Sequence, residues 1–138
     1  MPKLRTNRHE VSLRIWHPSI EPEDITRNLN LRADIQNRPG EIRQNRMGNP
    51  IPNSGQGTYW VHEYASSPHE LETNLERIMQ HLLAKKSLIS EISQTGGRCE
   101  LFVGIFLGDY SMGLDFRPEL MSIAAELNIH LALDLYSS

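Results

Sequence analysis

The chain has 138 residues, of which 38% are hydrophobic and 22% charged, with one cysteine and a formal net charge of −3. A chain of this length buries enough surface to form one domain without a disulfide. The longest apolar stretch, residues 101–108, is far shorter than the roughly 20 residues of a membrane-spanning helix. The first ten residues are charged and lack the apolar segment of a signal peptide. We therefore expect a single domain, 1–138, in the cytoplasm and not in a membrane.

Charge is unevenly distributed along the chain. Residues 1–46 contain nine Lys/Arg and six Asp/Glu, whereas residues 47–138 contain five Lys/Arg and eleven Asp/Glu. A basic segment can attract nucleic acid, and an acidic surface can attract a basic protein. The alternative is that both segments are solvated surfaces that keep the protein in solution.

The first two predicted elements are a strand and a short helix. Residues 11–16 place an aliphatic side chain at every second position, which is typical of a strand with one buried face. Residues 22–29 begin with a proline and two acids, and Ile25 and Leu29 are four residues apart. This pattern predicts a helix.

Residues 32–57 have no periodicity and many glycines and prolines, which indicates a long loop. Loops of this length are usually functional or disordered. The loop is either an anion-binding or partner-binding segment, or an insertion kept soluble by its charges. Its candidate anion-binding side chains are four arginines: Arg32, Arg38, Arg43 and Arg46.

The next two elements are a strand and a long helical region. Residues 58–64 are rich in aromatic and β-branched side chains, which favours a strand. Ser67, Pro68 and Glu70 have the spacing of a capping box, so we expect a helix to begin there. Its apolar stripe continues to Ile92, and residues 95–97 end the helical region. A bend is expected at residues 85–87 because one helix of this length would be unusual.

The remaining segments predict a central strand at 98–107, a turn, and a hairpin partner at 112–116. A helix beginning at Pro118 and a strand at 129–136 follow. From residue 58 onward the order is β-α-β-β-α-β, the ferredoxin-like split βαβ arrangement, with the first strand and helix as an N-terminal β-α addition. We therefore expect an α+β domain with a mostly antiparallel sheet and helices on one face.

The sheet face without helices is the first candidate functional surface. If the aliphatic side chains face the helices, the opposite side collects aromatic, acidic and basic residues, which suit protein binding. Alternatively, the long loop or the N-terminal addition covers this face and forms a second core. The candidate partner-binding residues are Trp16, Phe102, Asp115, Asp134 and Tyr136.

Signatures of enzymes and cofactor sites are weak. None of the three His-Glu pairs continues as His-Glu-x-x-His, and neither Gly-x-Gly-x-x-Gly nor a phosphate loop occurs. Cys99 lies in an apolar strand and is expected to be buried rather than nucleophilic. Asp109, Asp115 and Asp134 are too scattered to indicate a metal site. We expect no enzymatic activity, no cofactor and no metal.

Several structural motifs follow one another in a recognisable order along the chain. They are residues 11–15, Pro22-Glu23-Asp24-Ile25 to Leu29, Pro39-Gly40-Glu41, Trp60, Gly113-Leu114-Asp115-Phe116 and Leu133-Asp134-Leu135-Tyr136. Their order resembles a bacterial family known as domain of unknown function 4279. The resemblance covers nearly the whole chain and implies a small α+β protein, similar in size and style to immunity proteins, with no established activity or catalytic residues.

Two functions follow as hypotheses. The first is a non-enzymatic binding protein, such as an immunity protein that neutralises a basic toxin domain through an acidic, aromatic sheet face. The second is a nucleic-acid or phosphate-ligand binding domain that uses the loop arginines. We favour the first because acids outnumber bases in the C-terminal part of the chain. Homodimerisation is compatible with either function.

Overall fold

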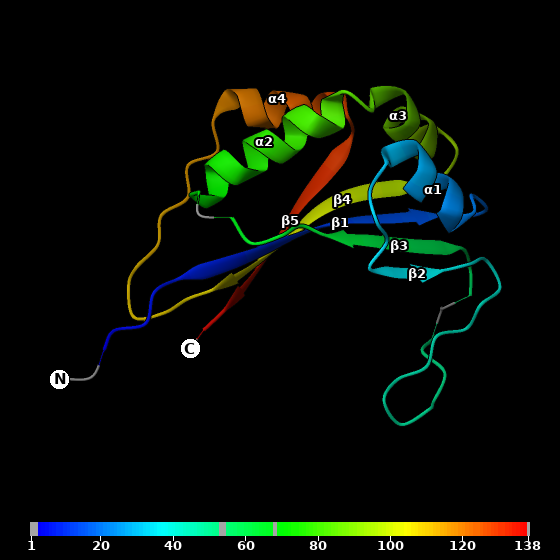
Figure 1. Ribbon diagram of the computed structural model, residues 1–138, viewed down its shortest axis with the longest axis horizontal. Coiled ribbons are helices and arrows are strands. Elements are labelled where there is room, and N and C mark those ends of the chain that lie inside the picture. The colour runs from blue at the N-terminus through cyan, green and yellow to red at the C-terminus, as the bar shows by residue number, and fades with distance from the viewer. Residues whose placement is uncertain (1–2, 53–54, 68, 138) are drawn as a thin grey trace.

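The computed structural model describes residues 3–52, 55–67 and 69–137. In these ranges five strands form one sheet, and four helices cover one of its faces (Figure 1). The elements are β1 (Arg8–His17), α1 (Pro22–Leu29), β2 (Ile35–Asn37), β3 (Thr58–Glu63), α2 (Leu71–Leu83), α3 (Lys86–Gln94), β4 (Arg98–Phe106), α4 (Pro118–Glu126) and β5 (Ile129–Tyr136). The chain is therefore an α+β protein, as the sequence predicts.

The sheet is mixed, with the strand order β2-β3-β1-β4-β5. All neighbouring strands are antiparallel except β4 and β5, which are parallel and joined through α4. The expected ferredoxin-like split and mostly antiparallel sheet are not confirmed. β1 is not an N-terminal addition but the central strand, because it pairs with β4 along nine residues. It occupies the position that the expected hairpin partner would take.

The expected strand at 112–116 is wrong. This segment has no strand pairing, yet Met112, Leu114 and Phe116 pack against the core. The backbone N–H of Asp115 donates to Glu72 Oε2 of α2, 3.1 Å away. The alternation in the sequence therefore reflects an extended segment with one buried side, lying against α2 rather than in the sheet.

The core lies between the sheet and the helices. Val11, Leu13 and Ile15 of β1 face it together with the corresponding aliphatic residues of β4. Trp60 of β3 is fully buried, and its indole Nε1–H donates to Thr26 Oγ1 of α1 at 2.9 Å. This hydrogen bond satisfies the polar atom of a large buried ring and attaches α1 to the sheet.

The helical region after β3 differs from the expectation at its start. α2 begins at Leu71, with Glu70 in the capping position and no side-chain cap. Ser67 Oγ instead accepts a hydrogen bond from the backbone N–H of His69, and Pro68 lies outside the described residues. The helical region is interrupted close to the predicted bend, but at Ala84 and Lys85 rather than at residues 85–87, since α3 already begins at Lys86.

The segment 32–57, expected to be a loop, contains the short strand β2, which pairs with β3. Residues 53–54 of this segment lie outside the described residues. Beyond β2 the segment extends away from the helices, at the opposite end of the molecule from both termini (Figure 1). No helix in the described part of the chain is long and apolar enough to cross a membrane.

Candidate functional site

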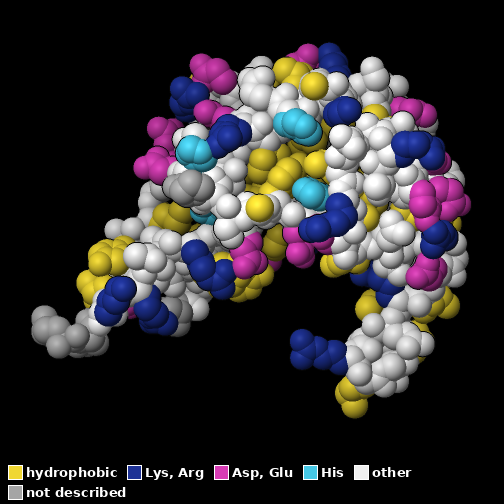
Figure 2. Space-filling view, viewed as in Figure 1, with side chains coloured by type: hydrophobic (Ala, Val, Ile, Leu, Met, Phe, Trp, Pro, Cys, Tyr) yellow, Lys and Arg dark blue, Asp and Glu magenta, His cyan; other side chains and the backbone are white. Residues whose placement is uncertain are grey.

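The candidate site is the sheet face that the helices do not cover, which we call the open face. Strand register and side-chain alternation show which side chains of β1, β3, β4 and β5 point away from the helices and so lie on this face. These are Tyr59, Val61 and Glu63 of β3, Arg8, Glu10, Ser12, Arg14 and Trp16 of β1, Arg98, Glu100, Phe102, Gly104 and Phe106 of β4, and His130, Ala132, Asp134 and Tyr136 of β5. Figure 2 shows that the molecule is hollowed beneath the sheet, between the extended loop and the chain ends.

Arginines stack on the aromatic rings of this face. The guanidinium carbon of Arg14 lies 3.7 Å from the ring centroid of Phe102. Arg8 lies 3.9 Å from the centroid of Phe106 in the same way. Two wider pairs complete the set: Arg98 over Trp16 at 5.8 Å, and Arg43 of the loop over Tyr59 at 4.8 Å. Such cation–π contacts hold the rings in place while leaving them half-exposed.

Most carboxylates of the open face already have a partner. Arg8 Nη1 donates to Glu10 Oε1 at 2.8 Å, and Arg98 Nη2 donates to Glu100 Oε2 at 2.9 Å. The Glu100 side chain is only 9% exposed. The Tyr136 hydroxyl donates to Asp134 Oδ2 at 3.3 Å, and partial desolvation, followed by the Asp134 charge, raises the pKa of Tyr136. The face is therefore of mixed charge rather than simply acidic.

Arg14 differs from the other arginines of the open face. It forms no hydrogen bond or ion pair with any described residue, and its buried Nε has no hydrogen-bond partner. A buried N–H without an acceptor costs free energy. Since Arg14 stands on the central strand, this cation is available to a group from another molecule.

Two hollows meet at Arg14 and Phe102. The first, of about 470 Å³, also contains Arg32, Tyr64 and Tyr136 in its lining. The second, of about 560 Å³, extends toward β5; Trp16, Arg98 and Asp134 line it. The centre of the open face is thus a shallow depression with an aromatic floor.

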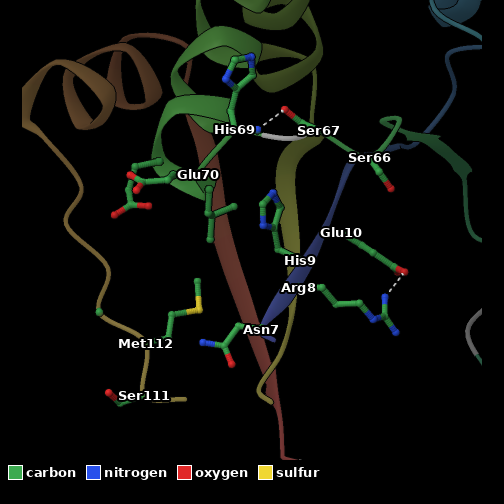
Figure 3. Close-up of a pocket in the computed structure, with 13 residues that line it drawn as sticks. Asn7, Arg8, His9, Glu10, Ser66, Ser67, His69, Glu70, Ser111 and Met112 are labelled. Atoms are coloured by element: carbon green, nitrogen blue, oxygen red, sulfur yellow. Dashed lines mark hydrogen bonds and ion pairs between the residues drawn. The ribbon is translucent and has the colours of Figure 1, made fainter. Parts of the chain in front are cut away.

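A third hollow, of about 610 Å³, lies at the start of β1, with His9, His69 and Glu70 in its lining (Figure 3). Its side chains come from three segments and make separate local contacts: Ser67 Oγ with the backbone N–H of His69, and Arg8 with Glu10. In the described ranges no three His, Cys, Asp or Glu residues are grouped as a metal ion would require.

The reactive side chains of the covered face serve the structure. Burial raises the pKa of the Cys99 thiol to about 12, so the thiolate nucleophile is suppressed. His17 Nδ1 accepts hydrogen bonds from the backbone N–H groups of Ser19 and Ile20, at 3.0 and 2.9 Å. Its Nε2 lies 2.7 Å from Thr95 Oγ1, whose hydroxyl donates to the Glu91 carbonyl. His17 is therefore a neutral ring that donates from Nε2.

The structure brings together four of the five predicted partner-binding residues. Trp16, Phe102, Asp134 and Tyr136 all lie on the open face. Asp115 does not, because the segment expected to carry it into the sheet is not a strand and lies against α2. Its expected position on the open face depended on the predicted hairpin strand at 112–116, which the structure does not contain.

The four loop arginines do not converge on one site. Arg32 Nη2 pairs with Asp34 Oδ1 at 2.9 Å, and Arg38 pairs with Glu21 and Glu23 at the start of α1. Arg43 stacks on Tyr59, and Arg46 is exposed. These arginines contact different parts of the molecule, so the structure does not bring them together into the anion site that was one of the two interpretations of the loop.

Sequence reasoning missed two of the arginines that stack on the rings, Arg8 and Arg98. Arg8 and Arg98 lie at the ends of β1 and β4, in the same alternation as Arg14. Extending the predicted first strand from residue 11 back to residue 8 would have found Arg8. Tyr59 was also missed, since its place on the open face follows only from the pairing of β3 with β1.

Comparison with known proteins identifies the family but not an activity. No curated protein and no solved structure matches the chain. The sequence model of one family, Domain of unknown function (DUF4279), matches residues 6–138, which is nearly the whole chain. The chain, with its five-stranded sheet and arginine-stacked open face, therefore belongs to the DUF4279 family.

Proposed function

We propose that the chain is a non-enzymatic binding domain that takes a partner protein on its open face. The observation that carries the proposal is the arrangement around Phe102: half-exposed aromatic rings, each backed by an arginine, at the floor of a depression. Trp, Tyr, Phe and Arg are the residues that most often dominate the energy of protein–protein interfaces. The described residues leave this floor uncovered.

The charges of the open face favour a protein over a nucleic acid. Glu10, Glu63 and Asp134 lie on it beside the arginines, and their carboxylates would repel a phosphate backbone. Arg32 and Arg38 of the loop are already paired with carboxylates. Alternating charges of both signs suit a protein surface, which also presents both.

A more specific form of the proposal is that the partner is a toxin, which the chain neutralises as an immunity protein. Immunity by contact needs no chemistry from the inhibitor. Asp134 would then meet a basic residue of the toxin, and Asp134→Lys would slow association because opposite charges steer encounter. An unchanged association rate would remove this specific form but not the binding function.

The experiment measures the affinity of a purified partner for single variants of the open face. Trp16→Ala and Phe102→Ala each remove a ring from the depression, and we expect each to weaken binding at least about tenfold. Gln80→Ala is the control, since it removes an exposed side chain from α2 in the helix layer. If both ring variants bind as tightly as the control, the open face is not the binding surface.

A second titration tests the nucleic-acid alternative. Single-stranded and duplex oligonucleotides are added to the wild-type chain at low and moderate salt, and we expect no binding beyond weak, non-specific association. Tight binding that falls steeply with salt and is lost in Arg14→Met would contradict the proposal and favour a nucleic-acid ligand.

A further inference from the structure

The free edge of β5 is a second surface, which adjoins the open face along His130, Ala132 and Asp134. β5 is the last strand of the sheet and pairs only with β4. The carbonyl of Tyr136 accepts a hydrogen bond from the backbone N–H of Leu107, next to β4. Because backbone groups alternate in direction along a strand, the N–H and C=O groups of Ile129, Leu131, Leu133 and Leu135 point to the free edge. None of these edge groups forms a backbone hydrogen bond with another described residue outside β5.

This edge lacks the features that usually prevent strands of different molecules from pairing. Residues 129–136 contain no proline, lysine or arginine. Leu135 is 60% exposed, and Met121 of the adjacent helix α4 is 54% exposed. The neighbouring strand contrasts sharply, since Val103 and Ile105 of β4 are at most 1% exposed. The apolar layer of the molecule is therefore left open along β5.

The sequence of β5 is complementary to itself in the antiparallel direction. With a two-fold axis at Ala132, Leu131 lies opposite Leu133 of a second copy, and Ile129 lies opposite its Leu135. On the other face, His130 lies opposite Asp134 of the second copy. Each aliphatic residue of β5 then lies opposite an aliphatic residue. His130, which is a cation when protonated, lies opposite the Asp134 carboxylate at two symmetry-related positions. We propose that two copies of this chain pair through their β5 edges in this register, which joins both sheets into one.

Backbone geometry supports this register. Residues 130, 132 and 134 direct their backbone groups at β4, so across the new edge they form the non-hydrogen-bonded pairs, in which Cα atoms are about 4.5 Å apart. His130 and Asp134 are thereby brought within reach of each other. Ala132, which meets its own copy at the axis, is small enough for this spacing.

Neighbouring registers lose these matches. An axis at Leu133 would place Asp134 opposite Ala132 and His130 opposite Tyr136. An axis at Leu131 would place His130 opposite Ala132 and Asp134 opposite Asn128. The leucines still lie opposite leucines in these neighbouring registers, so the charges of His130 and Asp134 specify the register. In the dimer the two open faces lie on the same side of the joined sheet.

The first test is the association state of the full chain, measured by sedimentation across a range of concentrations. We expect a concentration-dependent dimer. His130→Asp and Asp134→His each place like residues opposite one another at two positions, so we expect each to weaken dimerisation about tenfold. The double variant His130→Asp/Asp134→His restores the opposed pair and should restore dimerisation.

His81→Asp, at an exposed position of α2, is the matched control and should leave the dimer unchanged. Circular dichroism of each variant confirms that these surface substitutions leave the fold intact. A monomeric wild type at all concentrations would overturn the proposal, as would single and double variants that dimerise equally well.

Disulfide trapping tests the register independently. In Ala132→Cys, mild oxidation should link two copies, since only the residue at the axis meets its own copy at a Cα distance that a disulfide spans. Asp134→Cys should not link, because His130 lies opposite it. Cys99 is buried and stays out of the reaction. Linking through position 134 but not 132 would contradict the proposed register. None of these tests depends on the binding function of the open face.

Discussion

The two faces of the sheet are built by the same strands and differ in almost every property. On the covered face, Leu13 and Ile15 of β1 are fully buried against the helices. On the open face, the intervening Arg14 and Trp16 are half-exposed and contact other side chains through stacking. The covered face holds the molecule together by apolar burial. The aromatic rings of the open face are only half-buried, so we expect them to contribute less to folding, and we propose that they contact a partner.

The largest effect is expected on the covered face. Ile15→Ala removes a fully buried side chain from the central strand and leaves a cavity beneath the helices. We expect it to lower the free energy of unfolding by about 2–5 kcal/mol. Urea denaturation measures this value. A loss below about 1 kcal/mol would contradict the assignment of this face as the main source of stability.

A smaller, pH-dependent loss is expected at His17, a polar residue buried on the covered face. Burial lowers the pKa of His17 in the folded chain below its ordinary value of 6.5. As the pH falls below 6.5, the unfolded chain takes up the proton first, so the free energy of unfolding decreases. Urea denaturation at pH 7.5 and 5.5 should show this decrease in the wild type and a smaller one in His17→Gln. Equal decreases would assign the pH effect to other groups.

The ring at the centre of the open face should matter less for stability than for binding. Phe102→Ala removes the ring beneath Arg14, and we expect a loss of about 1 kcal/mol in the free energy of unfolding. This loss is well below that of Ile15→Ala in the same urea experiment. Equal losses would show that both faces support folding to the same extent, which would remove the contrast between them.

The smallest effect on stability is expected at Arg14. Arg14→Met keeps a long side chain over Phe102 and removes the buried Nε–H that lacks an acceptor. We expect the free energy of unfolding to change by no more than about 1 kcal/mol. The expected direction is an increase, because the unpaired N–H is removed. A decrease of 2 kcal/mol or more, on the order of a core truncation, would show that Arg14 has a structural role.

Side-chain alternation predicts which face of each strand is buried, but not which strands are neighbours. It located the strands β1, β4 and β5 and the aliphatic side of each, and it placed Trp16 and Phe102 on the same face. The strand β3 was predicted from its aromatic and β-branched residues, without an assigned face. It also predicted a strand at 112–116, where one side is buried against the core without any strand pairing. Alternation depends only on burial of one side, so it cannot distinguish a strand from an extended loop.

The central position of β1 could not be predicted from local sequence. It depends on pairing between residues 8–16 and 98–106, which are about 90 positions apart in the chain. The stacking of Arg8 on Phe106 and of Arg98 on Trp16 follows from this long-range register. Consequently the site residues were predicted one by one, whereas their arrangement as arginine–aromatic pairs required the structure.

The most direct test of the central claim is the affinity of a purified partner protein for the double variant Trp16→Ala/Phe102→Ala. The account predicts that this variant remains folded and binds the partner at least about 100-fold more weakly than the wild type, because two contacts of the depression are lost. Binding as tight as that of the wild type would contradict the claim that the open face is a partner-binding surface.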